Sequence, residues 1–417
     1  MSPSVRGLVA ILGTALLVAA CSSTTVTPSR STEPSPSPTS DAEPVVATPM
    51  TAEVIAPPIP VPTTDGKVHL AYELQLTNAV GQDLNVMSVT VKAGDKTLLT
   101  LAGDKLAYWT RTLGGKEPTT KVGPAQSVIV WLDVVIDGPT DSTPAVPQEL
   151  SHSVVVNLTK PAPPLLPATM TEDVAPVTVS THEPAVISPP LAGPRWLDAN
   201  GCCDMTAHRM ALNPLNGKLW AAERFAIDYV QLSADGTLYR GDRSKPESYP
   251  YFGADIHAVA DGPVVAVLDG LPEQVAGQTP TGLPLEQYGG NHVVQDISDG
   301  QGNRYYAFYA HLKTGTVKVK PGDRLTTGQV IANLGNTGNS DAPHLHFHVM
   351  STPDPLKSDG IPFVLKSFRL DGRLASIDGL GNLIDEGTSA PMQPGFAARD
   401  EANVSPLVLD EMTYAAG

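Results

Sequence analysis

The stretch that decides the fold runs from residue 305 to 349 and reads YYAFYAHLKTGTVKVKPGDRLTTGQVIANLGNTGNSDAPHLHFHV. Its first part is rich in aromatic residues and ends in Leu312, which predicts a strand. Turns are predicted at 322–323 and 328–329, and a glycine-rich loop at 335–338. The stretch therefore predicts short antiparallel strands joined by turns, with little helix.

The end of this stretch places three histidines at alternate positions, His344, His346 and His348. Residues i and i+2 of a strand lie on one face, so the three imidazoles are expected to point the same way. A row of imidazoles on one face is typical of a metal site. The alternative is an exposed strand edge that is rich in histidine, and the pattern alone does not choose between the two.

Composition limits the kinds of protein this chain can be. It has 417 residues, of which 40 are proline, and a formal net charge of −16. The length suffices for two ordinary domains, but many prolines cluster, so part of the chain cannot form a core. The acidic excess does not favour phosphate backbones or acidic lipid headgroups, and no nucleic-acid role is expected.

The N-terminus predicts export. Arg6 precedes the apolar run GLVAILGTALLVAAC (7–21), which is too short to span a bilayer permanently but suits a signal peptide. Its last four residues resemble a bacterial lipobox, so 1–21 is predicted to be a lipoprotein signal peptide. Lipidated Cys21 would then anchor the protein to the outer face of the cytoplasmic membrane, in the cell envelope. The alternative is an ordinary secretory signal with a chance cysteine.

The rest of the chain reads as an all-β protein with two domains. Residues 22–50 are Ser, Thr and Pro with few large apolar residues, which predicts a disordered tether. Short alternating runs over 51–160 predict an antiparallel β-sandwich. A Pro-rich linker is expected at 161–194, a second β domain at 195–375, and a loosely ordered acidic tail at 376–417.

Together with VADGPVVAVLDG (259–270) and RFAIDYV (224–230), the 305–349 stretch resembles the lysostaphin-type, LytM-like zinc metalloendopeptidases that hydrolyse peptidoglycan. The resemblance covers residues from about 224 to 350. It implies one Zn²⁺ bound by Asp228, His346 and an upstream histidine, with an open position for water. His311 and His344 would flank that water, as general base and as stabiliser of the tetrahedral oxyanion. Peptidoglycan peptides, in stems or crossbridges, are the implied substrate.

The sequence departs from the family at the first zinc ligand. The family pattern is His-x-x-x-Asp, and the position four before Asp228 holds Arg224, which has no lone pair to give. We expect His208 to take the ligand's place through a hairpin. If the loop is the three residues 215–217, His208 falls opposite Arg224 and on the same face. A two-residue loop would instead turn His208 away.

Three other histidines and two cysteines have ordinary interpretations. His348 is expected to be a surface residue or a neighbour of a ligand, and His257 and His292 surface or packing residues. The adjacent Cys202 and Cys203 favour a disulfide in an exported protein. A thiolate bound to zinc is the lesser alternative.

Two further hypotheses compete with an anchored zinc endopeptidase. The first is a non-catalytic member of the same fold that binds peptidoglycan or activates another hydrolase. The second is a sugar-phosphotransfer carrier domain, which export makes improbable because phosphoryl donors are cytoplasmic. The sandwich carries no cluster of His, Cys and carboxylates, so a structural role or a protein partner is expected for it.

Overall fold

The computed structural model describes residues 46–137, 146–300 and 302–415, and these are almost entirely strands and turns. The all-β prediction is confirmed. The signal peptide, Cys21 and nearly all of the tether lie outside the described residues. Within the described part, no helix is long and apolar enough to cross a membrane.

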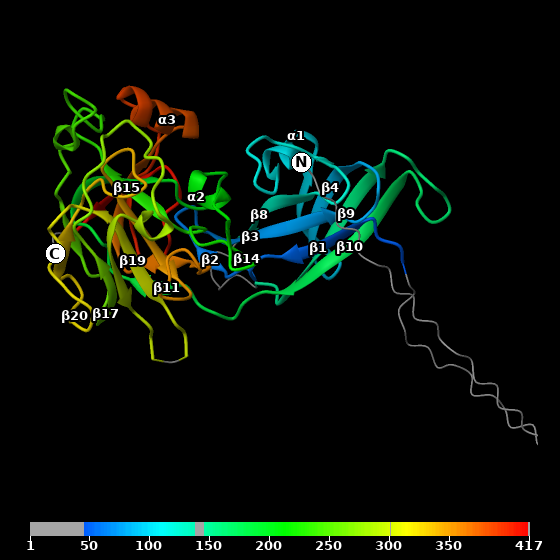
Figure 1. Cartoon of the computed structure of the whole chain (residues 1–417), viewed down its shortest axis with the longest axis horizontal. Helices are drawn as coiled ribbons and strands as arrows, with labels where there is room; N and C mark the ends of the chain where they lie inside the picture. Colours follow the sequence, from blue (N-terminus) through cyan, green and yellow to red (C-terminus); the bar gives the residue numbers. More distant parts are fainter. Residues whose placement is uncertain (1–45, 138–145, 301, 416–417) are drawn as a thin grey trace, which may run out of the picture. The chain divides into compact units, whose positions relative to one another are not determined.

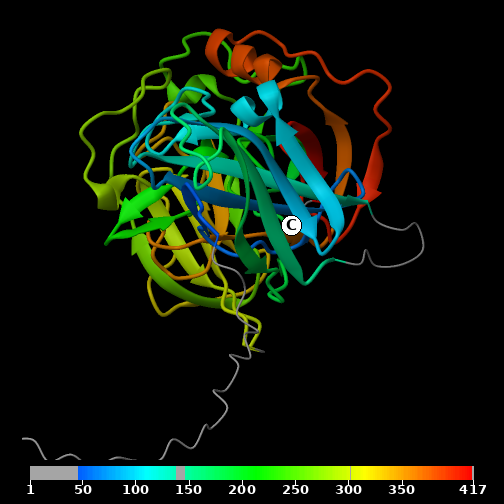
Figure 2. The ribbon, with the colours of Figure 1, turned by 90° about the vertical axis from the view of Figure 1, so that its right-hand side faces the viewer.

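The N-terminal domain is a sandwich of two antiparallel sheets (Figures 1 and 2). One sheet contains β1 (Met50–Val54), β2 (Val61–Pro62), β3 (Lys67–Asn78), β6 (Thr110–Thr112) and β8 (Ser127–Asp137). The other contains β4 (Leu84–Ala93), β5 (Lys96–Ala102), β7 (Lys121–Val122), β9 (Glu149–Leu158) and β10 (Thr169–Thr178), and α1 (Gly103–Tyr108) follows β5. Alternating apolar residues of both sheets, such as Tyr72 and Leu74 of β3, form the core between them.

The sandwich extends further along the chain than the sequence predicted. Residues 161–194 are not a bare linker, because β10 pairs with β9 from Thr169 to Thr178. Pro176 is tolerated in this strand because β10 lies at the sheet edge and its register shifts between Val174 and Val177. Proline is compatible with edge strands and bulges, where no ladder N–H is lost.

The C-terminal domain is built on an antiparallel sheet that has eleven strands among the described residues, in the order β20-β17-β18-β19-β22-β15-β12-β27-β25-β26, with β23 beside β22. Their bounds are β12 (Gly193–Ala199), β15 (Ile227–Gln231), β17 (Gly262–Leu268), β18 (Asn291–Asp296), β19 (Tyr306–Leu312), β20 (Arg324–Leu325), β22 (Leu345–Met350), β23 (Gly360–Ile361), β25 (Phe368–Arg373), β26 (Arg399–Glu401) and β27 (Asp410–Tyr414). The central strands β19 and β22 are buried along their whole length.

Shorter elements surround this sheet. Three strand pairs are β11 (Ala185–Ile187) with β24 (Phe363–Leu365), β13 (Asn213–Leu215) with β14 (Lys218–Trp220), and β16 (Asp255–His257) with β21 (Val330–Asn333). The helices are α2 (Ala207–Met210), α3 (Ile377–Glu386), η1 (Pro246–Ser248) and η2 (Leu285–Gln287).

The prediction of a loosely ordered tail is wrong. Strand β27 lies between β12 and β25 inside the large sheet, and its Met412 is fully buried. Two of its acidic residues are paired with arginines, since Asp410 accepts from Arg373 Nε at 2.6 Å and Glu411 from Arg195 Nε at 2.7 Å. The second domain therefore runs from about 193 to 415.

Candidate metal centre

The pairing of β15 with β22 sets the centre of the site. Asp228 lies directly opposite His346 in this antiparallel pair. The neighbours of Asp228, Ile227 and Tyr229, are buried in the domain core, so alternation directs Asp228 to the other face. There its Oδ1 lies 3.0 Å from His346 Nδ1.

Strand β19 brings His311 to the same place. Ala310 of β19 pairs with His346, and the chain leaves the regular strand conformation at His311, whose φ is 58°. The His311 ring donates from Nδ1 to the Thr337 carbonyl at 2.7 Å. Its centroid lies 5.7 Å from the His346 ring and 4.6 Å from the His344 ring.

His344 directly precedes β22 and completes the group from the predicted motif. Its Nδ1 lies 2.7 Å from the Ala342 carbonyl, which accepts a hydrogen bond from it. Its Nε2 lies 3.2 Å from Asp228 Oδ1. Because Nδ1 is engaged by the backbone, the ring presents Nε2 to the site.

His208 also reaches the site, but not by the predicted hairpin. Leu215 pairs with Lys218, so the loop is Asn216-Gly217, and the prediction of a three-residue loop is wrong. The strands are too short to include His208, which lies instead in α2. Its Nδ1 donates to the Ala226 carbonyl at 3.0 Å, and its Nε2 lies 3.2 Å from Asp228 Oδ2.

Two further residues contact the group. Asn200 donates from Nδ2 to Asp228 Oδ2 at 2.9 Å, and nothing in the sequence marked this residue. His348 Nδ1 lies 2.9 Å from His346 Nε2, and His348 is only 1% exposed. His348 was expected to be a surface residue or a neighbour of a ligand, and it is the second of these. The His-x-His-x-His alternation could have indicated this position.

Comparison with known proteins places part of the chain in a family. The model of peptidase family M23 matches residues 249–358. These residues form a peptidase M23 domain. The match includes His311, His344 and His346, whereas Asp228 and His208 lie before its first residue.

Named peptidases are similar to part of this chain. Glycyl-glycine endopeptidase ALE-1 of Staphylococcus capitis is 37% identical over 116 residues, 27% of this chain and 29% of that protein. Peptidoglycan DD-endopeptidase ShyC of Vibrio cholerae is 34% identical over 127 residues, 30% of this chain and 26% of that protein. The chain thus spans less than a third of the length of either relative. The catalytic domain of lysostaphin from Staphylococcus simulans aligns at 20% identity over 40% of this chain and 88% of that domain, with a TM-score of 0.23.

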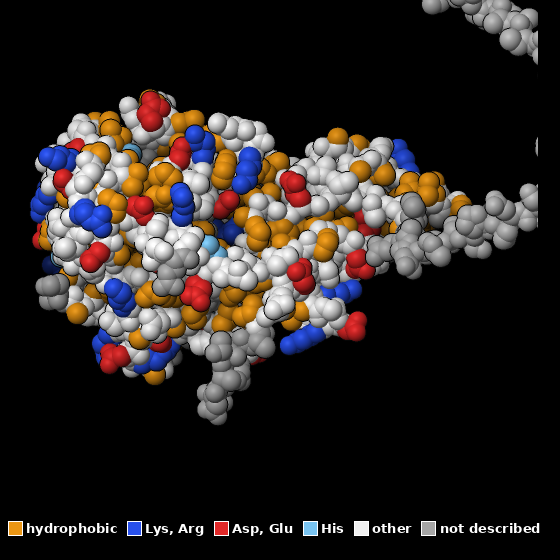
Figure 3. Space-filling view, turned by 90° about the horizontal axis from the view of Figure 1, so that it is seen from below, with side chains coloured by type: hydrophobic (Ala, Val, Ile, Leu, Met, Phe, Trp, Pro, Cys, Tyr) orange, Lys and Arg blue, Asp and Glu red, His pale blue; other side chains and the backbone are white. Residues whose placement is uncertain are grey.

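The C-terminal domain encloses these side chains. His208, His311 and His346 are 5–6% exposed. On the face drawn in Figure 3, histidine shows in only small areas, and acidic and basic side chains are interspersed. Charges held in such surroundings interact more strongly than charges in water.

Electrostatics separate the roles of the buried groups in the metal-free protein. Burial raises the pKa of Asp228, but the neighbouring His208 and His344 outweigh it and hold that pKa well below its usual range. Burial lowers the pKa of His208, but Asp228 outweighs it and raises the pKa to about 9. Burial, helped by His344 and His346, lowers the pKa of His311 well below the usual value. The carboxylate is thus ionised, whereas His311 is neutral.

The donor set of the C-terminal domain fits a metal ion. One ligand atom each from His208, Asp228 and His346 lies within 4.8 Å of the others, and the same holds for His311, His344 and His346. The bond from His208 Nδ1 to the Ala226 carbonyl turns Nε2 toward the carboxylate, and this nitrogen can bind a metal ion that displaces its proton. Two imidazoles and one carboxylate with an open position are the donors that a catalytic zinc site uses. All five predicted residues therefore converge on one place.

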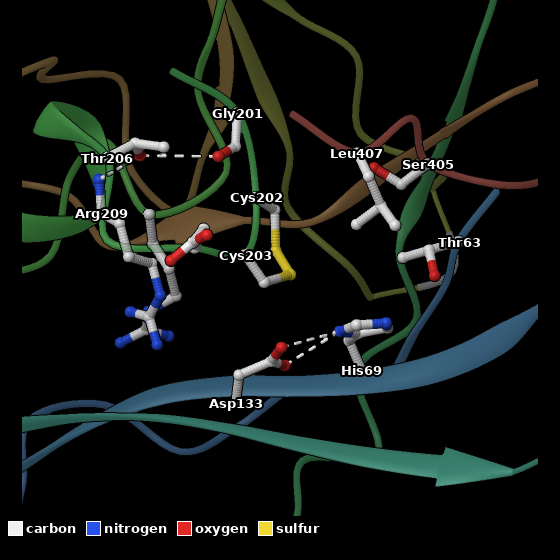
Figure 4. Close-up of a disulfide and its surroundings, with 12 residues drawn as sticks. Thr63, His69, Asp133, Gly201, Cys202, Cys203, Thr206, Arg209, Ser405 and Leu407 are labelled. Carbon is white, nitrogen blue, oxygen red and sulfur yellow. Dashed lines mark hydrogen bonds and ion pairs between the residues drawn. A yellow bond between two sulfur atoms is a disulfide. The ribbon is translucent and has the colours of Figure 1, made fainter. Parts of the chain in front are cut away.

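A third group of donors, His69, Asp133 and Cys203, lies at the base of the sandwich (Figure 4). Cys203 is bonded to Cys202, as predicted, so neither sulfur is a thiolate. His69 is held by Asp133 at 2.9 Å and by Asp65 at 3.2 Å. These contacts satisfy both of its ring nitrogens, which is a structural arrangement.

His257 and His292 take no part in either metal group of the C-terminal domain. His257 Nδ1 lies 2.9 Å from the Gly328 carbonyl, and His292 Nδ1 lies 2.8 Å from the Gly290 carbonyl. Both rings are bound to backbone, in keeping with the packing role expected for them.

Proposed function

We propose that this protein is a zinc endopeptidase that hydrolyses peptide bonds of cell-wall peptidoglycan. The observation that carries the proposal is the convergence of His208 Nε2, Asp228 and His346 Nδ1 beside the rings of His311 and His344. Two ligands would hold zinc poorly, and His208 supplies the third in place of the family's missing histidine.

His208, Asp228 and His346 would hold the ion. Zinc at this position supplies Lewis-acid polarisation of the scissile carbonyl and makes water a nucleophile near neutral pH. Asp228 balances the charge, and Asn200 and His348 orient the carboxylate and the His346 ring. Such outer partners fix the tautomer and direction of a ligand.

His311 and His344 would handle the proton and the developing charge. Each donates from Nδ1 to a backbone carbonyl, Thr337 and Ala342, so each ring turns its Nε2 toward the site. One imidazole can then take the proton of the attacking water, and the other, when protonated, can donate to the oxyanion. The base then returns the proton to the leaving amine.

The substrate class comes from the relatives. ALE-1 is named a glycyl-glycine endopeptidase and ShyC a peptidoglycan DD-endopeptidase, so both crossbridge and stem peptides are candidates. No feature of the described residues favours one bond over the other. We therefore propose peptidoglycan peptides as a class.

The test is metal content together with hydrolysis. Purified protein should contain one zinc per chain by elemental analysis and release peptides from purified peptidoglycan, detected by mass spectrometry. Chelation should abolish release, and added zinc should restore it. A folded wild-type protein without zinc and without released peptides would instead indicate the non-catalytic peptidoglycan-binding alternative.

The location is a separate part of the proposal. We propose that Cys21 carries lipid and anchors the protein to the outer face of the cytoplasmic membrane, with 22–50 as tether and the sandwich available to a protein partner. Only the sequence supports this anchor, because Cys21 lies outside the described residues. Cys21→Ser should release the protein from membranes, as measured by fractionation.

A further inference from the structure

We propose that Glu73 of the sandwich is a positioning residue for the metal centre. Its carboxylate binds two arginines, which hold the two chain segments that orient the His208 side chain. This inference rests on the proposed function and deepens it. It makes the sandwich part of the metal site and not only a spacer.

Glu73 is a fully buried carboxylate at an unusual place. It lies in β3, between Tyr72 and Leu74, whose side chains fill the sandwich core. Alternation along the strand directs Glu73 to the opposite face, away from that core. There it contacts two arginines of the second domain, Arg209 and Arg224, which are 1% and 2% exposed.

The first arginine holds the helix that carries His208. Arg209 follows His208 directly in α2 and donates from Nη1 to Glu73 Oε1. Its Nη2 also donates to the carbonyls of Tyr72 at 3.1 Å and Leu132 at 2.9 Å, on β3 and β8. Figure 4 shows the Arg209 side chain extending toward these two strands from the part of the chain that follows the disulfide-bonded cysteines.

Helix α2 depends on contacts with the rest of the protein. It has only four residues, and a single turn of helix is not stable by itself. Thr206 caps it by accepting from Arg209 N at 3.2 Å and donates to the Asn200 carbonyl at 3.0 Å. These local bonds shape the turn, but the side chain of Arg209 is what attaches it to a rigid sheet.

The second arginine holds the segment that orients the His208 ring. Arg224 donates to both oxygens of Glu73, from Nε at 3.1 Å and from Nη2. Ala226, two residues further along, provides the carbonyl that accepts from His208 Nδ1. One carboxylate therefore fixes both the backbone beside His208 and the acceptor that sets its tautomer.

The same contacts explain what became of the family's ligand position. Arg224 stands where the family has its first zinc ligand, and its guanidinium is committed to Glu73. A buried ion pair often adds little net stability compared with an apolar substitute, so we assign this one a role in geometry. Through it, Arg224 helps to hold the segment that orients His208.

The test is zinc binding by full-length Glu73→Gln. The variant keeps the size of the side chain and loses the charge that both arginines bind. Loss of a partner that orients a metal ligand typically costs about 10- to 100-fold in affinity, and we expect that increase in the Kd for zinc, measured by competition with a chromophoric chelator. The cobalt-loaded variant should show altered visible absorption.

The matched control is Glu172→Gln. Glu172 is a sandwich glutamate that is 3% exposed, accepts from Met50 N at 3.3 Å and contacts neither arginine. It should bind zinc like the wild type. An equal loss of affinity in both variants, or unchanged affinity in Glu73→Gln, would overturn the proposal. If Glu73→Gln does not fold, the same zinc-affinity measurement is made on Arg209→Lys. This variant keeps the positive charge but cannot form the several hydrogen bonds of the guanidinium, so it should also bind zinc more weakly than the wild type.

A measurement without metal separates this inference from the proposed function. In the metal-free wild type, the proton on His208 Nδ1 should exchange slowly in ¹H–¹⁵N spectra because it is bonded to the Ala226 carbonyl. That signal should persist in Glu172→Gln and be lost in Glu73→Gln. Absence of zinc from the wild type would refute the proposed function alone, whereas a signal that survives in Glu73→Gln would refute the positioning role.

Discussion

Replacing His208 by Ala should remove about a third of the free energy of zinc binding without unfolding the protein. The four ligands of zinc-finger sites together contribute about 10–16 kcal/mol, or about 2.5–4 kcal/mol per ligand. Because 1.4 kcal/mol is about tenfold, the Kd should rise by about 100- to 1,000-fold. Arg224 cannot compensate, since it has no lone pair and is bound to Glu73.

Zinc-dependent stabilisation turns this change into a measurement. At free zinc of about 1,000 times the wild-type Kd, the metal should raise the free energy of unfolding of the wild type by about 4 kcal/mol. For His208→Ala the same zinc concentration corresponds to only about 1 to 10 times the Kd, so the increase should be about 0.4–1.4 kcal/mol. Urea unfolding with and without zinc measures both values.

A matched variant controls for the loss of any imidazole. His257 also donates to a backbone carbonyl and lies in the same domain but outside the metal groups, so His257→Ala should keep the full zinc effect. The reasoning would be refuted if His208→Ala showed wild-type stabilisation by zinc while Asp228→Asn lost it. The site would then be a two-ligand arrangement, and the assignment of His208 would be wrong.

The remaining predictions concern three other histidines. His311→Gln should keep zinc but lower kcat on peptidoglycan about 100- to 1,000-fold, as removal of a group that takes a proton or stabilises charge in the transition state does, and parallel loss of zinc would contradict this role. His348→Phe removes the group behind His346 and should weaken zinc binding about 10- to 100-fold in chelator competition; an unchanged Kd would count against it. Burial lowers the pKa of His69, but its two aspartate partners outweigh it and raise the pKa to about 9, above the unfolded value of 6.5. Its protonated form should therefore stabilise the fold fully below pH 6.5, by up to about 3 kcal/mol, and lose this effect as the pH rises through 9. The difference in free energy of unfolding between wild type and His69→Gln, measured in urea, should shrink as the pH rises from 6.5 through 9. A constant difference would exclude the ion pair.

The sequence was sufficient for the part of the site that lies on regular strands. Asp228 in an apolar strand, and His344 and His346 at alternate positions, have faces that follow from the period of two. The pairing of Asp228 with His346 then brings the carboxylate and the imidazole together. The buried aspartate was informative because an unpaired carboxylate there would cost several kcal/mol.

Irregular segments were not predictable in the same way. The argument that placed His208 depended on a hairpin register, but the hairpin has a two-residue loop and His208 lies outside it. The residue reaches Asp228 through α2, whose position depends on contacts about 136 residues away in sequence. Acidic composition likewise suggested disorder for the segment that contains Asp410, because composition does not reveal the arginine that pairs with it.

Arg224 shows why a missing motif residue is weak evidence for a dead enzyme. A metal ligand needs a donor atom at the right point in space, and a loop from elsewhere in the chain can supply it if that loop is rigid. In the proposed arrangement, Glu73 would supply this rigidity, because it binds the arginine beside His208 and also Arg224. The place of Arg224 and the orientation of His208 would then both depend on one carboxylate. A chain with arginine at the first position but no buried acid opposite it, and no histidine beside a second arginine, should bind no zinc.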